Sequence, residues 1–192
     1  MTGKTHRTIG MTAAAAAAAY LVWTAPHYAP ATVAAVLLAG HIGALLPDMD
    51  STAGEIWQSI PMGKVVGTVA SKAAFGHRNL THSLVGLALF GGASWWLLSH
   101  LPGYWGLEMA WVWRAFMIGY VSHLLADGIT EEGIPLLWPV QHMYGFPPRP
   151  FEDVRIVTGG WFENLIIFPA VAIIFWGGIY LYWPLIRLYL LK

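Results

Sequence analysis

The chain of 192 residues has no cysteine, which excludes disulfide bonds and thiolate metal sites and leaves the redox compartment open. Only 10% of its residues are charged, whereas soluble domains have roughly 25%. It also lacks a basic tract, so nucleic acid is not expected as a partner. Hydrophobic residues make up 57% of the chain, and the mean hydropathy is +0.56. This composition predicts one all-α domain, residues 1–192, that resides in a lipid bilayer.

Five apolar segments approach the length of about 20 residues that a helix needs to cross a bilayer. They cover residues 8–24, 31–46, 81–100, 107–129 and 161–182, and the last reaches toward Leu191 in its longest form. We therefore predict a bundle of about five transmembrane helices. The first two segments are short, and a buried helical hairpin is the alternative for them.

The first segment also has two features of a signal peptide, because Lys4 and Arg7 precede an alanine-rich stretch. The residues that follow, 25–30, contain two prolines and bulky rings, which make a poor cleavage site. We therefore expect the segment to be retained.

Small residues recur every four positions in two of the segments, at Ala35, Ala39 and Gly43 and at Ala88 and Gly92. Such spacing lets helix backbones approach closely, which favours association where lipid competes for every apolar contact. It predicts one packing face on each of these two helices.

Two long connections, residues 51–80 and 130–160, join helices on the same side of the predicted bundle. The first contains apolar runs that suit a helix lying in the membrane interface. The second contains five prolines, which disfavour a long regular helix. Long loops on one face of a compact bundle indicate that this face is the functional one.

Basic residues are distributed unequally between the two sides. The loop-bearing side has Lys4, Arg7, Lys64, Lys72, Arg78, Arg149 and Arg155, and the opposite side has Arg187 and Lys192. An excess of Lys and Arg marks the cytoplasmic side of a membrane protein. We expect an inner-membrane protein whose loop-bearing face lies in the cytoplasm.

The strongly polar groups of the chain lie where an apolar segment starts or stops. They are His6, residues 47–50 (Pro-Asp-Met-Asp), residues 77–83 (His-Arg-Asn-Leu-Thr-His-Ser) and residues 123–127 (His-Leu-Leu-Ala-Asp). Helices that cross the bilayer alternately up and down bring all four groups to the loop-bearing face. This convergence predicts a metal site at the membrane surface.

His123 and Asp127 are four residues apart on a predicted helix, so they share one face with Cβ atoms roughly 5–6 Å apart. An imidazole and a carboxylate at this spacing can hold one metal ion. An ionisable group inside a membrane helix costs a few kcal/mol, so such a pair is seldom accidental. The alternative is a hydrogen-bonded pair that only ties helices together.

Asp48 and Asp50 follow Pro47, which ends the second predicted helix. Two neighbouring carboxylates repel each other unless a cation or a proton lies between them. Acids at a helix C-terminus also oppose the helix dipole. We predict metal binding for both, with solvation in a loop as the alternative, and Asp50 is in addition a candidate catalytic residue.

His77 and His82 are candidate ligands of one site if His77 precedes the helix, which an N-cap at Asn79 or Thr81 would permit. Arg78 lies between them, and its fixed fork of donors suits a phosphate group. Arg78 is therefore a candidate catalytic residue. The alternative is a solvated helix start with one structural histidine.

Two further candidates lie on the same face. His6 precedes the first helix and is a candidate metal ligand. Glu163 lies near the start of the last helix and is a candidate catalytic base or ligand. Favourable placement of an acid at a helix N-terminus is the alternative for Glu163.

The predicted metal ligands are therefore seven: His6, Asp48, Asp50, His77, His82, His123 and Asp127. A catalytic zinc ion takes three protein ligands and a water, so two ions that share a bridging oxygen fit this set better. The mixture of imidazole and carboxylate favours zinc, with manganese as the alternative.

The order of these motifs resembles that of the YdjM-type inner-membrane metal-dependent hydrolases. The resemblance rests on Thr5-His6 and on the three polar motifs at residues 46–50, 77–83 and 123–127, and it extends from His6 to about Trp138. The pattern is also similar to that of the zinc-dependent phospholipase C and P1 nuclease superfamily, helical proteins whose clustered metal ions cut phosphoesters.

The second resemblance implies metal ligation by Asp48, His82, His123 and Asp127, and extends less directly to the other three candidates. This chain departs from those soluble enzymes because its site is embedded in a membrane bundle and has fewer histidines. A full centre of three metal ions is therefore not expected.

These observations lead to the hypothesis of a membrane-embedded metal-dependent hydrolase that cleaves a phosphoester of a lipid or lipid-linked substrate. Arg78 would stabilise the developing charge. Three alternatives remain: a haem-binding electron-transfer protein, a metal transporter, and a scaffold in which metal only staples helices together. Carboxylates gathered at one interface fit haem ligation poorly, and the far half of the helices offers little of the polar path that a transporter needs.

Overall fold

The computed structural model describes residues 1–24, 30–51, 57, 61, 63–73, 79–101 and 106–190. The α-helices are α1 (Gly3–Thr24), α2 (Pro30–Leu45), α4 (Gly63–Ala73), α5 (Leu84–His100), α6 (Met109–Gly128) and α7 (Phe168–Leu190). The 3-10 turns are η1 (Pro47–Asp50), η2 (Leu80–His82) and η3 (Glu152–Val154), and η4 (Glu163–Ile167) is π-helical. The predicted all-α class is confirmed.

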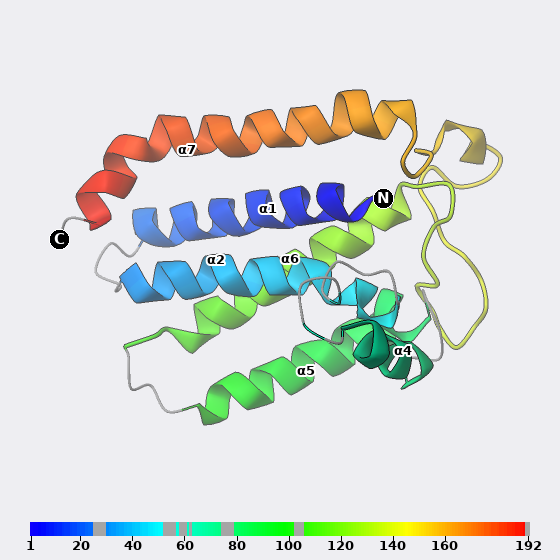
Figure 1. Ribbon diagram of the computed structural model, residues 1–192, viewed down its shortest axis with the longest axis horizontal. Helices are drawn as coiled ribbons and strands as arrows, with labels where there is room; N and C mark the ends of the chain where they lie inside the picture. Colours follow the sequence, from blue (N-terminus) through cyan, green and yellow to red (C-terminus); the bar gives the residue numbers. More distant parts are fainter. Residues whose placement is uncertain are drawn as a thin grey trace.

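Helices α1, α2 and α6 pack against one another and form the centre of the bundle, while α5 lies beside α6 and α7 lies along α1 (Figure 1). Glycines allow the close packing at the centre. A Cβ on Gly43 would overlap the main-chain oxygen of Phe116, and a Cβ on Gly119 would overlap that of Gly40. Because the backbones of α2 and α6 touch here, the predicted packing face at Ala39 and Gly43 is confirmed.

The predicted packing face at Ala88 and Gly92 is wrong. Both residues are exposed, and no described atom lies within 4 Å of a Cβ placed on Gly92. Helix α5 instead presents Gly91 to α6, where Gly91 meets the thioether of Met117 and its carbonyl accepts a hydrogen bond of 2.8 Å from Trp113 Nε1. Adjacent residues on a helix differ by about 100° in direction, so a shift of one position changes the face.

The number of membrane-spanning helices is not confirmed. Among the described residues, the helical stretch Glu163–Pro184 is both long and apolar enough to cross a membrane. Helices α2 and α5 are apolar but contain only 16 and 17 residues. By length and composition, the described residues therefore contain one clear candidate for a spanning helix, and the predicted number of about five stays a prediction.

The polar segments of the chain meet at one end of the bundle, which we call the site end (Figure 1). This end contains the starts of α1 and α5, the ends of α2 and α6, the turn η1, and the beginning of the last helix at η4. The helix expected within residues 51–80 is α4. It packs through Gly63 and Gly67 on Trp57, whose Nε1 donates a hydrogen bond of 2.9 Å to Met49 O in η1.

The connection between α6 and the last helix contains no long helix, as its prolines predicted. It is held in place by two isolated bridges, which pair Thr130 with Ile156 and Ile134 with Tyr144. The connection covers the site end of the bundle (Figure 1).

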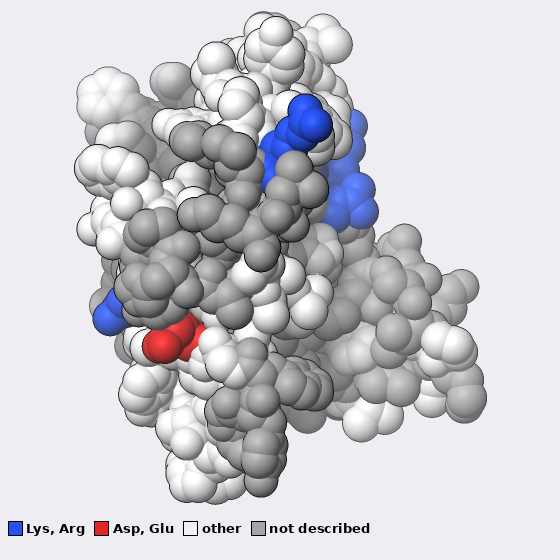
Figure 2. All heavy atoms as spheres, turned by 90° about the vertical axis from the view of Figure 1, so that its left-hand side faces the viewer, with Lys and Arg blue, Asp and Glu red and all other residues white. Residues whose placement is uncertain are grey.

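The opposite end, which we call the far end, shows few charged groups among its described residues (Figure 2). Glu108, Arg114 and Arg187 are exposed there. Large aromatic side chains such as those of Trp23 and Trp183 are also exposed, as expected for rings at a water–lipid boundary.

Candidate metal centre

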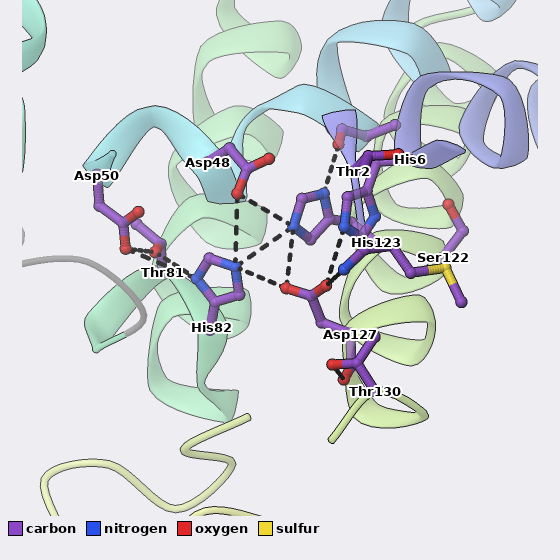
Figure 3. A network of polar contacts seen from close by, with 12 residues as sticks. Thr2, His6, Asp48, Asp50, Thr81, His82, Ser122, His123, Asp127 and Thr130 are labelled. Atoms are coloured by element: carbon purple, nitrogen blue, oxygen red, sulfur yellow. Dashed lines mark hydrogen bonds and ion pairs between the residues drawn. The ribbon is translucent and has the colours of Figure 1, made fainter. Parts of the chain in front are cut away.

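Two imidazoles and two carboxylates point toward one another at the site end (Figure 3). His82 Nε2 lies 3.3 Å from His123 Nε2, 3.4 Å from Asp127 Oδ2 and 3.9 Å from Asp48 Oδ1. His123 Nε2 lies 3.6 Å from Asp48 Oδ1 and 3.8 Å from Asp127 Oδ2. We call His82, His123, Asp48 and Asp127 the four-donor set.

These separations match the dimensions of a tetrahedral metal site. Donor atoms bound to zinc at about 2.0–2.2 Å in tetrahedral geometry are about 3.3–3.6 Å apart. The two histidine nitrogens lie 3.3–3.9 Å from each other and from the two carboxylate oxygens, which is equal to or slightly larger than this. A divalent ion held between the two histidine nitrogens and a carboxylate would therefore require only a small contraction of these side chains.

The four members of the set come from three local structures. His123 and Asp127 lie one turn apart on α6, and Asp48 lies in η1, just after α2 ends before Pro47. His82 lies in η2, because α5 begins at Leu84 and not at Thr81 as predicted. The reason is that Ser83 caps the helix, with its Oγ accepting a hydrogen bond of 3.1 Å from Gly86 N.

His6 joins the cluster on the other side of Asp127. Its Nε2 lies 2.9 Å from Asp127 Oδ1, and its ring stacks on that of His123 with centroids 3.8 Å apart. The main-chain nitrogen of Met1 lies 2.5 Å from the same carboxylate oxygen. Asp127 therefore presents Oδ2 to the four-donor set and Oδ1 to His6, which is the arrangement of a carboxylate that can bridge two cations.

A main-chain carbonyl orients the ring of His123. Nδ1 of His123 lies 2.7 Å from the carbonyl oxygen of Ala44, which can only accept a hydrogen bond. Nδ1 therefore holds the proton, and Nε2 directs its lone pair at the cluster. Metal-binding histidines usually have such a partner on the second ring nitrogen.

Asp50 and Thr81 support the ring of His82. Thr81 Oγ1 donates a hydrogen bond of 2.5 Å to Asp50 Oδ2 and lies 3.0 Å from His82 Nδ1. Asp50 Oδ2 lies 3.6 Å from the same ring nitrogen. The structure thus places Asp50, predicted as a ligand and catalytic residue, behind His82 and outside the four-donor set.

Burial lowers the pKa of the His82 imidazole, but hydrogen bonds and charges from Asp127 and Asp50 outweigh it and raise the pKa to about 8. The ring is therefore protonated at neutral pH without a metal. A metal ion must displace this proton to bind, so metal binding at His82 releases a proton.

Two further hydrogen bonds hold the surrounding backbone. The hydroxyl of Tyr120 donates to Thr81 O at 2.6 Å, and that of Thr130 donates to Asp127 O at 2.7 Å. The supporting roles of Thr81, Tyr120 and the Ala44 carbonyl were not predicted. One sequence signal was available for Tyr120, because it precedes His123 by three residues and so lies on the same face of α6.

Glu163 is buried at the site end but is outside the donor groups found among the described residues. Its Oε1 accepts hydrogen bonds from Thr2 N and Thr2 Oγ1 at 2.8 and 2.6 Å, and its Oε2 accepts one from Gly159 N at 2.8 Å. This carboxylate therefore ties the start of the last helix to the start of α1. His77 and Arg78, two other predicted site residues, lie outside the described residues.

The cluster is almost completely shielded from water. His6, His82, His123 and Asp127 are each at most 1% exposed, whereas Asp48 is 22% exposed. Burying several ionisable groups together is costly unless they are paired or bind a metal ion. The structure therefore combines an apolar helical bundle with a buried imidazole–carboxylate cluster that is suited to a divalent cation.

The chain belongs to the YdjM inner membrane protein family, which it matches over residues 1–190. This membership confirms the predicted YdjM family and the inner-membrane location. The hydrolase activity, the relation to the phospholipase C and P1 nuclease superfamily and the orientation in the membrane stay predictions.

Relatives include the uncharacterized protein YvsG of Bacillus subtilis (strain 168), with 32% identity over 87% of this chain and 88% of the relative. The inner membrane protein YdjM of Escherichia coli (strain K12) is 36% identical over 54% of this chain and 48% of that protein. The inner membrane protein YbcI of the same strain is 33% identical over 64% of this chain and 68% of that protein. No solved structure matches the chain.

Proposed function

We propose that this inner membrane protein is a metal-dependent hydrolase whose main ion is bound by His82, His123, Asp48 and Asp127. The observation that supports this most directly is the spacing of the two histidine nitrogens from each other and from the two carboxylate oxygens, 3.3–3.9 Å, which is close to the edge of a tetrahedron around zinc. The mixed nitrogen and oxygen donors favour zinc, with manganese as the alternative.

A second, more weakly held ion is part of the proposal. His6 Nε2 and Asp127 Oδ1 would bind it, and the Asp127 carboxylate would bridge the two ions. His6, His123 and Asp127 form a group of possible ligands that overlaps the main set. Because His123 Nε2 can serve only one ion, the second position has fewer protein ligands.

The proposed reaction is hydrolysis of a phosphoester. Divalent ions bound in this way polarise a phosphoryl oxygen and lower the pKa of a water toward neutrality. Asp48, the only partly exposed member of the four-donor set, would face the entering substrate and water. The hydrogen bond from His123 to Ala44 and the contacts of His82 with Thr81 and Asp50 would hold the imidazoles in place throughout.

The proposed substrate is a lipid or a lipid-linked molecule, because the cluster lies at one end of a bundle in the membrane. Arg78 stays the predicted partner of the phosphate group, and a cytoplasmic location of the site stays a prediction from the distribution of basic residues. The resemblance of the motifs to the zinc-dependent phospholipase C and P1 nuclease superfamily supports the same reaction class.

The test combines elemental analysis of the protein purified in detergent with assays on phosphomonoester and phosphodiester substrates. We expect at least one equivalent of zinc or manganese, turnover of one substrate class, and loss of both in Asp127→Asn. An Asp153→Asn variant, which changes an exposed acid outside the cluster, should retain both. Protein that is folded and free of metal would contradict the proposal.

The second candidate function is a structural metal site, in which the ion only holds the helices together. It is favoured by the near-complete burial of the cluster and by its four protein donors, since structural zinc sites are closed by four ligands. In that case Asp127→Asn would lose metal and thermal stability together, and the metal-loaded protein would turn over no member of the substrate panel.

A further inference from the structure

Four large apolar side chains in the segments that form the site end are exposed. They are Leu125 on α6, Phe146 and Val154 in the connection after α6, and Trp161 just before η4, with exposed fractions of 67%, 70%, 75% and 71%. We call these four residues the collar. Apolar side chains that are exposed together in one region of a protein mark a surface for a partner or a membrane.

Main-chain hydrogen bonds fix the collar at the level where α6 ends. Phe146 N donates to Gly128 O at 2.7 Å, in the last turn of that helix. Ile156 N, two residues after Val154, donates to Ile129 O at 3.1 Å. The connection therefore folds back against the end of α6 and does not extend freely away from the bundle.

The side chain of Arg155 braces this part of the connection. Its Nε donates to Pro147 O at 2.8 Å and its terminal nitrogen donates to Gly145 O at 3.2 Å. These two carbonyls flank Phe146, and a Cβ on Gly145 would collide with the guanidinium group. The guanidinium therefore holds the backbone on both sides of Phe146 while the phenyl ring remains exposed.

One collar residue directly precedes the helical stretch that can span a membrane. Trp161 precedes Glu163–Pro184, which is long and apolar enough to do so. Within that stretch, Ile173 and Trp176 are 72% and 65% exposed. When this stretch spans the bilayer, it passes through the interface where it begins, which puts Trp161 near the headgroups, where tryptophan is enriched.

We propose that the collar inserts into the boundary between headgroups and acyl chains of the leaflet next to the metal centre. The partner of this surface is the lipid itself. The exposed apolar side chains would bury their area there, as the apolar faces of interfacial helices do at about 5–10 Å depth. Because Phe146 is anchored to Gly128, one residue after Asp127, the collar holds the metal centre close to the level of the headgroups.

The absence of cysteine in the chain allows a direct test, because a single introduced cysteine carries the only label. Phe146→Cys and Val154→Cys, each labelled with a polarity-sensitive fluorophore, would be reconstituted in vesicles of phosphatidylethanolamine and phosphatidylglycerol in equal amounts. We expect emission shifted to the blue and roughly twofold or greater quenching by lipids spin-labelled near the headgroup, with weaker quenching by lipids labelled near the chain end.

Asp153→Cys is the matched control, because Asp153 is the exposed neighbour of Val154 in η3. Its label should be quenched by iodide from the aqueous phase, and the two collar labels should be protected. Labels at both collar positions that iodide quenches as strongly as the control would overturn the proposal. Protection from iodide without quenching by the spin-labelled lipids would also overturn it, since protein would then cover the collar.

Using two collar positions guards against the failure of one variant to fold. Circular dichroism and size-exclusion chromatography should match the unsubstituted protein for each. A variant that fails this comparison is replaced by Leu125→Cys, for which the same quenching pattern is expected and the same two outcomes count against the proposal.

Discussion

The two ends of the bundle contain similar residue types in opposite surroundings. At the site end, His82 and His123 are fully buried, and their ring nitrogens have partners on both sides. At the far end, His100 is exposed, and its Nδ1 lies next to the preceding turn of its own helix and its neighbour Ser99. The difference shows that burial and convergence of several helices, rather than residue type, distinguish a site from a solvated helix end.

The acids show the same contrast. Asp127 is 1% exposed and lies within 4 Å of three histidines, whereas Glu108 is exposed. Exposed tryptophans occur at both ends and do not distinguish them. Substitutions at the site end should change metal binding, with effects that decrease from His123 to Glu163, whereas substitutions at the far end should not.

The largest effect is expected from the histidines. His123→Ala removes a donor and the Ala44 contact together, so metal affinity should fall by more than the about 10–100-fold that the loss of an outer partner causes. His100→Ala, at the far end, should leave the metal content unchanged. Elemental analysis and competition with a coloured chelator measure both. Equal metal content in the two variants would remove the distinction between the ends.

The second effect concerns the support of His82. Asp50→Asn weakens the acceptor of the Thr81 hydroxyl behind the ring, so we expect metal affinity to fall about 10–100-fold. Glu108→Gln is the far-end counterpart and should change nothing. A titration with zinc in the presence of a competing chelator gives both affinities. A loss of more than 100-fold would show that Asp50 is itself a ligand.

The third effect is a dependence on pH. The pKa of His82 is raised to about 8, so below that pH the proton competes with the metal ion for this ring. Affinity should therefore fall about tenfold for each pH unit below 8 and level off above it. Asp50→Asn removes one of the causes of the raised pKa and should move the levelling point to lower pH. The same chelator titration, repeated between pH 6 and pH 9, tests both statements; affinity independent of pH would contradict them.

The smallest effect on the metal is expected from Glu163. Glu163→Gln disrupts the bond from Gly159 N and weakens those from Thr2, which should lower the free energy of unfolding by about 1–3 kcal/mol. The affinity of the four-donor set should change only a few-fold, because Glu163 touches none of its members. Glu131→Gln, which changes an exposed acid in the connection after α6, should change neither quantity. Thermal unfolding in detergent and metal titration separate the two effects.

The sequence predicted the helices well, because long apolar segments interrupted by proline and polar motifs leave few alternatives. It was less reliable where a single residue decides the outcome. The N-cap of α5 is Ser83 and not Thr81, so the helix starts later than predicted. The glycine that packs on α6 is Gly91 and not Gly92, so a different face of α5 is buried. Neither difference could be derived from local spacing, since both depend on how α5 is rotated against α6.

The part of the candidate site that could be predicted consists of residues at the ends of helices. Convergence of His6, Asp48, His82, His123 and Asp127 follows from alternating helices that each carry a polar residue at the same end. The different position of Asp50 could not be predicted, because the 3-10 geometry of η1 separates it from Asp48. The structural role of Glu163 could not be predicted either, because its partner Thr2 lies at the other end of the sequence.

The uneven exposure of the donors has a kinetic consequence. Three members of the four-donor set are at most 1% exposed and Asp48 is 22% exposed, so a bound ion would exchange with the solution past Asp48. Loading and release would then depend on movement of the Asp48 side chain and not on the equilibrium affinity alone. Chelators should strip the protein slowly, over a time that depends on the side chain at position 48 and hardly on the chelator concentration.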